Sequence, residues 1–187
     1  MAEHEQYFDY LTKRSWRALL YRKFYLYPRL CYHLKGLTLD VGCGIGDMLQ
    51  SRRNTIGADI NPYLVAYCRQ KGLDARLIED GRLPFENETF QSVVLDNVLE
   101  HILSPNDLID ELYRVIEQGG RLVIGVPGAK GYRRDADHKV FYDEKKLTDT
   151  IQGKGFVRSS TFYTPIKSDW MNHHLSFYCL FGVFLKS

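Results

Sequence analysis

The sequence predicts an α/β fold in which a mostly parallel sheet is covered by helices on both faces. Short apolar runs alternate with helical patterns along most of the chain, which is the order that produces parallel strands joined by helices. The run RLVIGV at residues 121–126 is typical of a strand that is buried on both of its faces. A chain of 187 residues is long enough for one domain with a substantial core and too short for two comfortable ones.

The individual elements follow from local patterns. We expect helix over residues 7–35, where aromatic and basic side chains alternate, with a break near Pro28. Pro62 is placed to open a helix, Asp143 to cap another, and the glycine pair at 119–120 to end a third. The predicted strands are 37–41, 55–60, 75–78, 90–96, 121–126, 156–163 and 175–185, and the predicted helices after the first are 45–53, 62–71, 105–117 and 143–153, with a loop over 128–142.

Composition and charge exclude several classes of protein. Hydrophobic residues make up 44% of the chain and charged residues 26%, as in ordinary globular proteins. The net charge of +2 argues against a nucleic-acid partner. The four cysteines are scattered without a CxxC pair, so we interpret them as reduced thiols of a cytoplasmic protein, with no disulfide frame and no zinc site. No apolar run reaches the roughly 18 residues of a membrane span, and the acidic start MAEHEQ is unlike a signal peptide.

The stretch LDVGCGIGDML at residues 39–49 joins a predicted strand to a predicted helix through a glycine-rich turn. Glycine permits sharp bends and lets a ligand approach where a Cβ would clash. In a parallel sheet such a turn lies at the carboxyl ends of the strands, where ligands bind, and the next helix directs backbone N–H groups at them. A tight structural turn is the alternative. Gly42, Gly44 and Gly46 run G-x-G-x-G, whereas a dinucleotide fingerprint requires a glycine at Asp47.

An acid ends the second predicted strand, within IGADINP. A carboxylate at Asp59, close to the glycine turn, is suited to accept hydrogen bonds from both hydroxyls of a ribose. A solvated acid at a strand end is the alternative interpretation. Because dehydrogenases use the same device, Asp59 indicates a nucleoside without saying which one.

Four motifs follow one another in the chain. They are D-x-G-x-G-x-G from Asp40, the acid at Asp59, EDGRLPFENETFQSVVLDNVLEHI at 79–102, and ELYRVIEQGGRLVIGVPG at 111–128. Over residues 36–158 the chain closely resembles the type-11 branch of the class I S-adenosylmethionine-dependent methyltransferases. The resemblance implies a Rossmann-like three-layer sandwich with a seven-stranded, mostly parallel sheet and an antiparallel last strand. It also implies S-adenosyl-L-methionine as the cofactor.

The same resemblance implies a set of cofactor contacts. In the family the acid at Asp80 meets the adenine amino group, and the residues after the fourth strand, here 97–99, pass under the methionine part of the cofactor. The cofactor-binding residues implied in this way are Asp40, Gly42, Cys43, Gly44, Gly46, Asp59, Ile60, Asp80, Gly81, Asn97 and Val98.

Two histidines are candidates for catalysis. Methyl transfer from a sulfonium is an in-line displacement that depends on positioning and needs no metal. If the acceptor is a hydroxyl, a base should take its proton, and histidine is the natural candidate near neutral pH. His138 and His101 follow the fifth and fourth predicted strands, where this architecture places the acceptor, and Asp137 is placed to orient His138. The alternatives are a structural or cofactor-side role for His101 and a backbone-bonded loop role for His138.

Three further residues are expected to contact the acceptor. Arg133 lies in GAKGYRRDADHK, where an arginine can grip a phosphate or carboxylate, although a solvated loop explains the same charges. Tyr142 is expected to line the pocket, and His173, between the last two predicted strands, to close its other side.

Two hypotheses describe the function. The first is a methyltransferase acting on an oxygen of a small molecule, such as a sugar, a lipid-linked intermediate or another metabolite, with residues 1–35 as a helical lid or cap and 36–187 as the cofactor-binding domain. NPYL at 61–64 is similar to a motif of base-methylating enzymes but follows the second strand instead of the fourth, so no nucleic acid is expected. The alternative is a non-catalytic S-adenosylmethionine-binding module whose aromatic N-terminal helix engages a partner protein or the periphery of a membrane.

Overall fold

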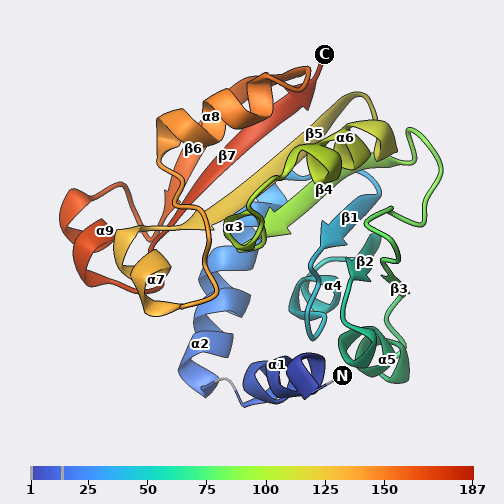
Figure 1. The fold of residues 1–187 in the computed structure, drawn as a ribbon, viewed down its shortest axis with the longest axis horizontal. Coiled ribbons are helices and arrows are strands. Elements are labelled where there is room, and N and C mark those ends of the chain that lie inside the picture. The colour runs from blue at the N-terminus through green and yellow to red at the C-terminus, as the bar shows by residue number, and fades with distance from the viewer. Residues whose placement is uncertain (1, 14) are drawn as a thin grey trace.

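One seven-stranded sheet forms the centre of the computed structural model, which describes residues 2–13 and 15–187 (Figure 1). Its strands are β1 Thr38–Val41, β2 Thr55–Asp59, β3 Ala75–Leu77, β4 Phe90–Asp96, β5 Ile116–Pro127, β6 Phe156–Thr164 and β7 Cys179–Lys186. They lie in the order β3-β2-β1-β4-β5-β7-β6. Neighbours from β3 to β5 are parallel, whereas β7 is antiparallel to both β5 and β6. The predicted fold class, with its antiparallel last strand, is confirmed.

Helices cover both faces of the sheet. They are α1 Ala2–Thr12, α2 Trp16–Tyr21, the π-helical turn η1 Arg22–Leu26, α3 Tyr27–His33, α4 Asp47–Ser51, α5 Pro62–Gln70, the 3-10 turn η2 Leu99–His101, α6 Asn106–Val115, α7 Ala129–Arg134, α8 Glu144–Gln152 and α9 Asp169–His174. Buried side chains of α6 and α8 belong to one core, and those of η1, α3 and α4 to another. No helix within 2–13 or 15–187 is long and apolar enough to cross a membrane.

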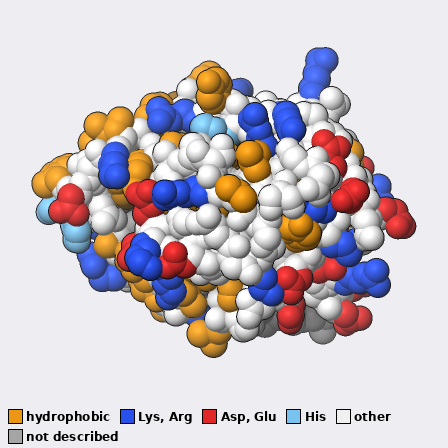
Figure 2. Space-filling model, turned by 90° about the horizontal axis from the view of Figure 1, so that it is seen from above, with side chains coloured by type: hydrophobic (Ala, Val, Ile, Leu, Met, Phe, Trp, Pro, Cys, Tyr) orange, Lys and Arg blue, Asp and Glu red, His pale blue; other side chains and the backbone are white. Residues whose placement is uncertain are grey.

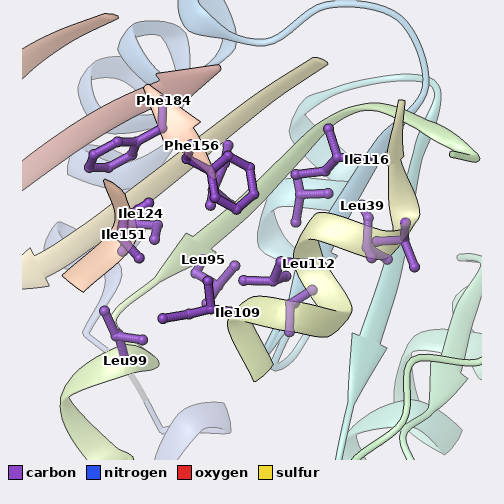
Figure 3. Packing of buried hydrophobic residues seen from close by; sticks show 14 of the residues in the cluster. Leu39, Leu95, Leu99, Ile109, Leu112, Ile116, Ile124, Ile151, Phe156 and Phe184 are labelled. Atoms are coloured by element: carbon purple, nitrogen blue, oxygen red, sulfur yellow. The ribbon is translucent and has the colours of Figure 1, made fainter. Parts of the chain in front are cut away.

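The two cores lie on opposite faces of the same strands. On β4, Val93 and Leu95 join the core under α6 and α8, whereas Val94 between them joins the core under α3. This alternation follows from the strand period of two and explains why the central strands are apolar throughout. Figure 3 shows how Ile109 and Leu112 of α6 pack against the larger core.

The chain order creates a crevice at one end of the sheet. From β1 the chain moves outward to β2 and β3, and it then returns to β4 on the other side of β1. The carboxyl ends of β1 and β4 are therefore the switch point at which ligands bind in folds of this kind. Helices α1, α2 and α7 lie at the end of the molecule toward which these strands point (Figure 1).

The N-terminal helix is interrupted, but not where the sequence suggested. The predicted break near Pro28 is wrong, because helix continues from Trp16 to His33 and the interruption lies between Thr12 and Trp16, where Ser15 caps α2. Pro28 lies in the first turn of α3. The π-helical turn before it, closed by the Tyr27 N–H bond to the Arg22 carbonyl, widens the helix where a proline ring would otherwise crowd the preceding turn.

Four other boundaries differ from the predictions. Helix α4 begins at Asp47 instead of 45, because Gly46 adopts a left-handed conformation. The predicted helix 105–117 ends at Val115, and β5 includes the glycine pair 119–120 in a register irregularity opposite β4. The predicted loop 128–142 contains α7, and residues 175–178, predicted to start the last strand, form a turn after α9, so β7 begins at Cys179.

Candidate cofactor and acceptor site

The glycine turn follows β1 directly and forms the floor of the crevice. Gly42 has a φ of +77°, and its N–H donates to the Ala58 carbonyl at 2.8 Å. A Cβ at this position would overlap Cγ2 of Val98, which follows β4. The turn therefore requires glycine both for its backbone conformation and for the close approach of the segment after β4.

Asp59, at the end of β2, ties this turn to the next loop. Its Oδ2 accepts the N–H of Gly44 at 2.9 Å, and its Oδ1 accepts the N–H of Asn61 at 2.9 Å. Burial raises the pKa of Asp59, and the two backbone donors oppose that shift. Because each carboxylate oxygen has a second lone pair, the group keeps acceptor capacity for a ligand. Ile60 beside it is 66% exposed and offers an apolar surface.

The turn after β3 brings the predicted adenine-side acid toward the same edge. Asp80 and Gly81 have φ values of +52° and +73°, and both are exposed. The N–H of Ile78 donates to the Asp59 carbonyl at 2.9 Å, which fixes the start of this turn beside the end of β2. Asp40, Asp59 and Asp80 thus lie in a row along the carboxyl ends of β1, β2 and β3.

At the end of β4, Asn97 bends the chain back across the crevice. It has a φ of +58°, and its N–H donates to the Gly125 carbonyl at 3.0 Å. Its side-chain amide donates to Oδ1 of Asp96 at 2.8 Å. Nearby, burial raises the pKa of Asp40 to about 8, and the negative charge of Asp96 adds to the shift. A carboxyl group with a raised pKa thus lies beneath the turn.

Arg22 was not identified from the sequence and lies in the same region. Its Nη2 donates to Oδ2 of Asp96 at 2.7 Å, and its Nε donates to the hydroxyl of Tyr27 at 2.9 Å. Burial opposes the charge of Arg22, but Asp96, Tyr27 and Asp47 together outweigh it, so the pKa of the guanidinium is raised above its ordinary value. The N-terminal segment therefore supplies a charged group to the end of β4.

Helix α1 packs over the glycine turn. Leu11 is buried with Ile45 and Leu64, and the ring of Phe8 contacts that of Tyr67 edge to face at 5.4 Å. The side-chain amide of Asn61, which caps α5, donates to the backbone carbonyl of His4 at 2.8 Å. This position fits the expected lid, although its role stays a prediction.

The two catalytic candidates lie side by side. The rings of His101 and His138 are 4.7 Å apart, and Nδ1 of His101 is 3.1 Å from Oδ2 of Asp137. Asp137 therefore holds His101, not His138 as expected. Nδ1 of His138 is 2.9 Å from the Tyr132 carbonyl. Glu100, which was not selected from the sequence, lies against both histidines, and burial raises its pKa to about 8.

A hollow of about 230 Å³ lies beyond the end of β5. Tyr142 lines it, and burial together with the charge of Glu100 raises the pKa of its phenol, while its place in an acceptor pocket stays a prediction. Arg133 and His173 are exposed on α7 and α9 and are not among its lining residues, and His173 bonds instead to the Asp169 carbonyl at 3.0 Å. The other lining residues are Pro127, Gly128, Phe141, Asp143, Glu144, Tyr163, Lys167, Ser168, Asp169, Asn172, Tyr178 and Leu180.

Known proteins share both the sequence pattern and the fold. Residues 39–124 match the model of a family described as a methyltransferase domain, type 11. The probable tRNA methyltransferase 9B of Homo sapiens is 30% identical over 130 residues, which are 64% of this chain and 26% of that protein. The demethylmenaquinone methyltransferase of Thermus thermophilus is 35% identical over 98 residues, which are 46% of this chain and 44% of that protein. The chain thus matches less than half the length of either relative.

Among solved structures, a methyltransferase of Thermotoga maritima, described as a possible histamine N-methyltransferase, has a TM-score of 0.72 and 18% identity over 100% of this chain and 96% of that chain. The likeness shows the same fold. The sheet order and the glycine turn with its strand-end acids define a class I S-adenosylmethionine-dependent methyltransferase fold. Within that class, residues 39–124 are similar to the methyltransferase domain family, and S-adenosyl-L-methionine is the cofactor that this similarity and the fold imply.

Proposed function

We propose that the protein transfers the methyl group of S-adenosyl-L-methionine to an oxygen of a small-molecule acceptor. The observation that carries the proposal is the glycine turn at Gly42, which is closed by Val98 on one side and tied to Asp59 on the other. This arrangement leaves backbone and carboxylate groups, without bulky side chains, at the carboxyl ends of β1 and β2. An adenosyl group needs such a surface for its ribose and its sulfonium arm.

The cofactor contacts in this proposal follow the row of strand-end groups. Asp59 accepts the ribose hydroxyls, Asp80 meets the adenine amino group, and the 97–98 segment lies under the methionine part. Cys43 and Gly46 shape the turn itself. Helix α1, which packs on Ile45 and is bonded to Asn61, closes over the bound cofactor.

The acceptor in this proposal occupies the hollow beside Tyr142. Its aromatic lining suits a ring-containing or partly apolar molecule. Of the two relatives named above, one is named for a quinone precursor and the other for tRNA. The hollow favours the small molecule, and acidic and basic side chains are interspersed on the face shown in Figure 2. Absence of a nucleic-acid partner and a cytoplasmic location remain predictions.

The cluster of Glu100, His101 and His138 adjoins this hollow through Tyr142. We infer that it promotes loss of the acceptor's proton. Arg133 and His173 remain candidates for acceptor contact only if their segments approach the hollow when it is filled.

Binding of S-adenosylhomocysteine tests the cofactor half of the proposal. Asp59→Asn removes the charge that would hold the ribose, and charge-assisted hydrogen bonds of about 1.5–3 kcal/mol each imply at least a tenfold weaker Kd. Asp149→Asn on α8, an exposed acid that pairs with Lys145, is the matched control and should leave the Kd unchanged. Equal affinity of the Asp59→Asn variant and the parent for S-adenosylhomocysteine would contradict the proposal that Asp59 binds the ribose.

Measuring methyl transfer tests the acceptor half of the proposal and distinguishes it from the alternative of a non-catalytic binding module. One observation favours that alternative: Trp16 and Phe24 are 66% and 68% exposed on α2 and η1, beside the basic residues Arg17 and Lys23. Labelled cofactor should be offered with phenolic, quinol and sugar acceptors and with tRNA. Methylation of a small acceptor supports the proposal, methylation of tRNA corrects its acceptor, and tight cofactor binding without any transfer supports the module.

A further inference from the structure

Glu100 carries a buried carboxyl group that lacks hydrogen-bond partners among the described residues. The residue is fully buried, and neither of its side-chain oxygens has a hydrogen-bond partner among the residues that the structure describes. Its backbone is well satisfied, since the Glu100 carbonyl accepts the N–H groups of Lys139 and Val140 at 2.8 and 3.0 Å. Burying a polar group without a hydrogen-bond partner costs free energy. Because the backbone bonds keep Glu100 in this buried position, its unpartnered side chain requires an explanation.

His138 faces this carboxylate with an unused nitrogen. Its Nδ1 is 2.9 Å from the Tyr132 carbonyl, which can only accept, so Nδ1 carries the proton and Nε2 has a free lone pair. Nε2 is 3.8 Å from Oε1 of Glu100, which is too long for a hydrogen bond. The imidazole also stacks on the ring of Tyr132 at 5.5 Å and 18°, which fixes its plane.

His101, beside His138, is held in a similar manner. Its Nδ1 is 3.1 Å from Oδ2 of Asp137, a carboxylate that leaves the other nitrogen of the ring with its lone pair. One ligand atom from each of Glu100, His101 and His138 lies within 4.8 Å of the other two. Histidines that bind metals almost always donate their second nitrogen to a carboxylate or a backbone carbonyl, and both partners are present here.

We propose that Glu100, His101 and His138 bind a divalent transition-metal ion, with zinc as the best-fitting member. Two imidazoles and one carboxylate are a ligand set of catalytic zinc sites that keep an open position, whereas magnesium and calcium prefer oxygen ligands throughout. Two ligands of one tetrahedral zinc are about 3.4 Å apart when each bond is about 2.1 Å. The observed 3.8 Å between Nε2 and Oε1 therefore requires only a small side-chain movement. This departs from the expectation of no metal and no zinc site.

The position of the site gives the ion a role that rests on the proposed function. Tyr142 lines the hollow and is close enough to Glu100 for that charge to act on its phenol, so an acceptor oxygen in the hollow would lie near the ion. A bound hydroxyl has a lowered pKa and releases its proton to water. The oxygen then forms a bond to the methyl carbon while the carbon–sulfur bond breaks, and the electron pair stays on sulfur as a neutral thioether. The histidines hold the ion and do not themselves take the proton.

Metal binding is tested without any acceptor. The chain, freed of purification tags and treated with chelator, is titrated with Zn²⁺ by calorimetry, and Co²⁺ is added to a second sample to record its ligand-field absorption. We expect one ion per chain and a tetrahedral or five-coordinate cobalt spectrum. His138→Ala and Glu100→Gln should each weaken binding by at least about a hundredfold, and Asp137→Asn by about tenfold.

The control is His174→Ala, because this exposed histidine on α9 bonds to the Trp170 carbonyl and lies outside the cluster. Circular dichroism shows whether each variant is folded, and Zn²⁺ should raise the Tm of the parent and of the control but not of His138→Ala. No binding by the folded parent at about 100 μM Zn²⁺, or equal binding by parent and variants, overturns the site. Cofactor binding measured in chelator is independent of this result, so the two proposals fail separately.

Discussion

Asp40 makes the stability of the protein depend on pH in a direction opposite to that of most carboxylates. Burial raises its pKa to about 8, with Asp96 and Asp59 raising it further and Arg22 opposing them. In the unfolded chain the pKa is near 3.8. Between these values the folded state binds the extra proton, so stability is lost as the pH rises from about 4 to 8.

Replacing Asp40 by Asn removes this dependence at nearly constant shape. For a pKa of about 8 in the folded state and 3.8 in the unfolded state, raising the pH from about 5.5 to 7.5 lowers the free energy of unfolding by about 2.5 kcal/mol through this group alone. Asp40→Asn lacks this titrating group. Its free energy of unfolding relative to that of the parent should therefore increase by the same amount over this pH interval.

Urea unfolding at the two pH values, in chelator, measures the difference. The comparison between variant and parent cancels the groups that do not interact with Asp40, such as Glu100, provided that the m-values agree. Asp149→Asn serves as the exposed control and should show no interval effect. Parallel stability curves for Asp40→Asn and the parent would mean that Asp40 is ionised in the folded state, and the description of the turn would have to change.

Three further changes test the packing around the site. Gly42→Ala strains a positive φ and overlaps Val98, so cofactor affinity should fall more than tenfold. Adding Val98→Ala removes the overlap and should restore only part of the affinity, because about 1–3 kcal/mol of backbone strain remains. Leu112→Ala should cost about 2–5 kcal/mol in urea unfolding, whereas Leu103→Ala, at a residue 75% exposed, should cost little. Arg22→Met leaves the Asp96 carboxylate without its charged partner and with only the Asn97 amide bonded to it, so unfolding should become easier by about 3 kcal/mol. An unchanged midpoint would show that the ion pair contributes nothing.

The sequence was sufficient to predict the sheet because its signals are local. The alternation of Val93, Val94 and Leu95 between two cores makes the strand apolar throughout, which is visible without any structure. Helix breaks were less predictable. Pro28 has a strong local preference, but the π-helical turn at η1 accommodates it, and no local pattern indicates such a turn.

The site residues also differ in how far local sequence predicted them. Asp40 and Asp59 end apolar runs, so their place at the carboxyl edge follows from the strands that carry them. The partnership of Arg22 with Asp96 joins residues 74 positions apart, and its only sequence signal is a basic residue in an aromatic helix. Glu100 lies beside a candidate histidine shortly after the fourth strand, but its lack of partners is visible only in three dimensions.

The place of β7 between β5 and β6 has a consequence for biosynthesis. Strand β6 pairs with β7 and with no other strand in the described sheet. Until residues 179–186 emerge from the ribosome, the sides of β5 and β6 that β7 will occupy therefore both lack a partner strand. Stop codons shortly before Cys179 should therefore yield aggregated product, whereas trimming of the first helix should leave the sheet intact.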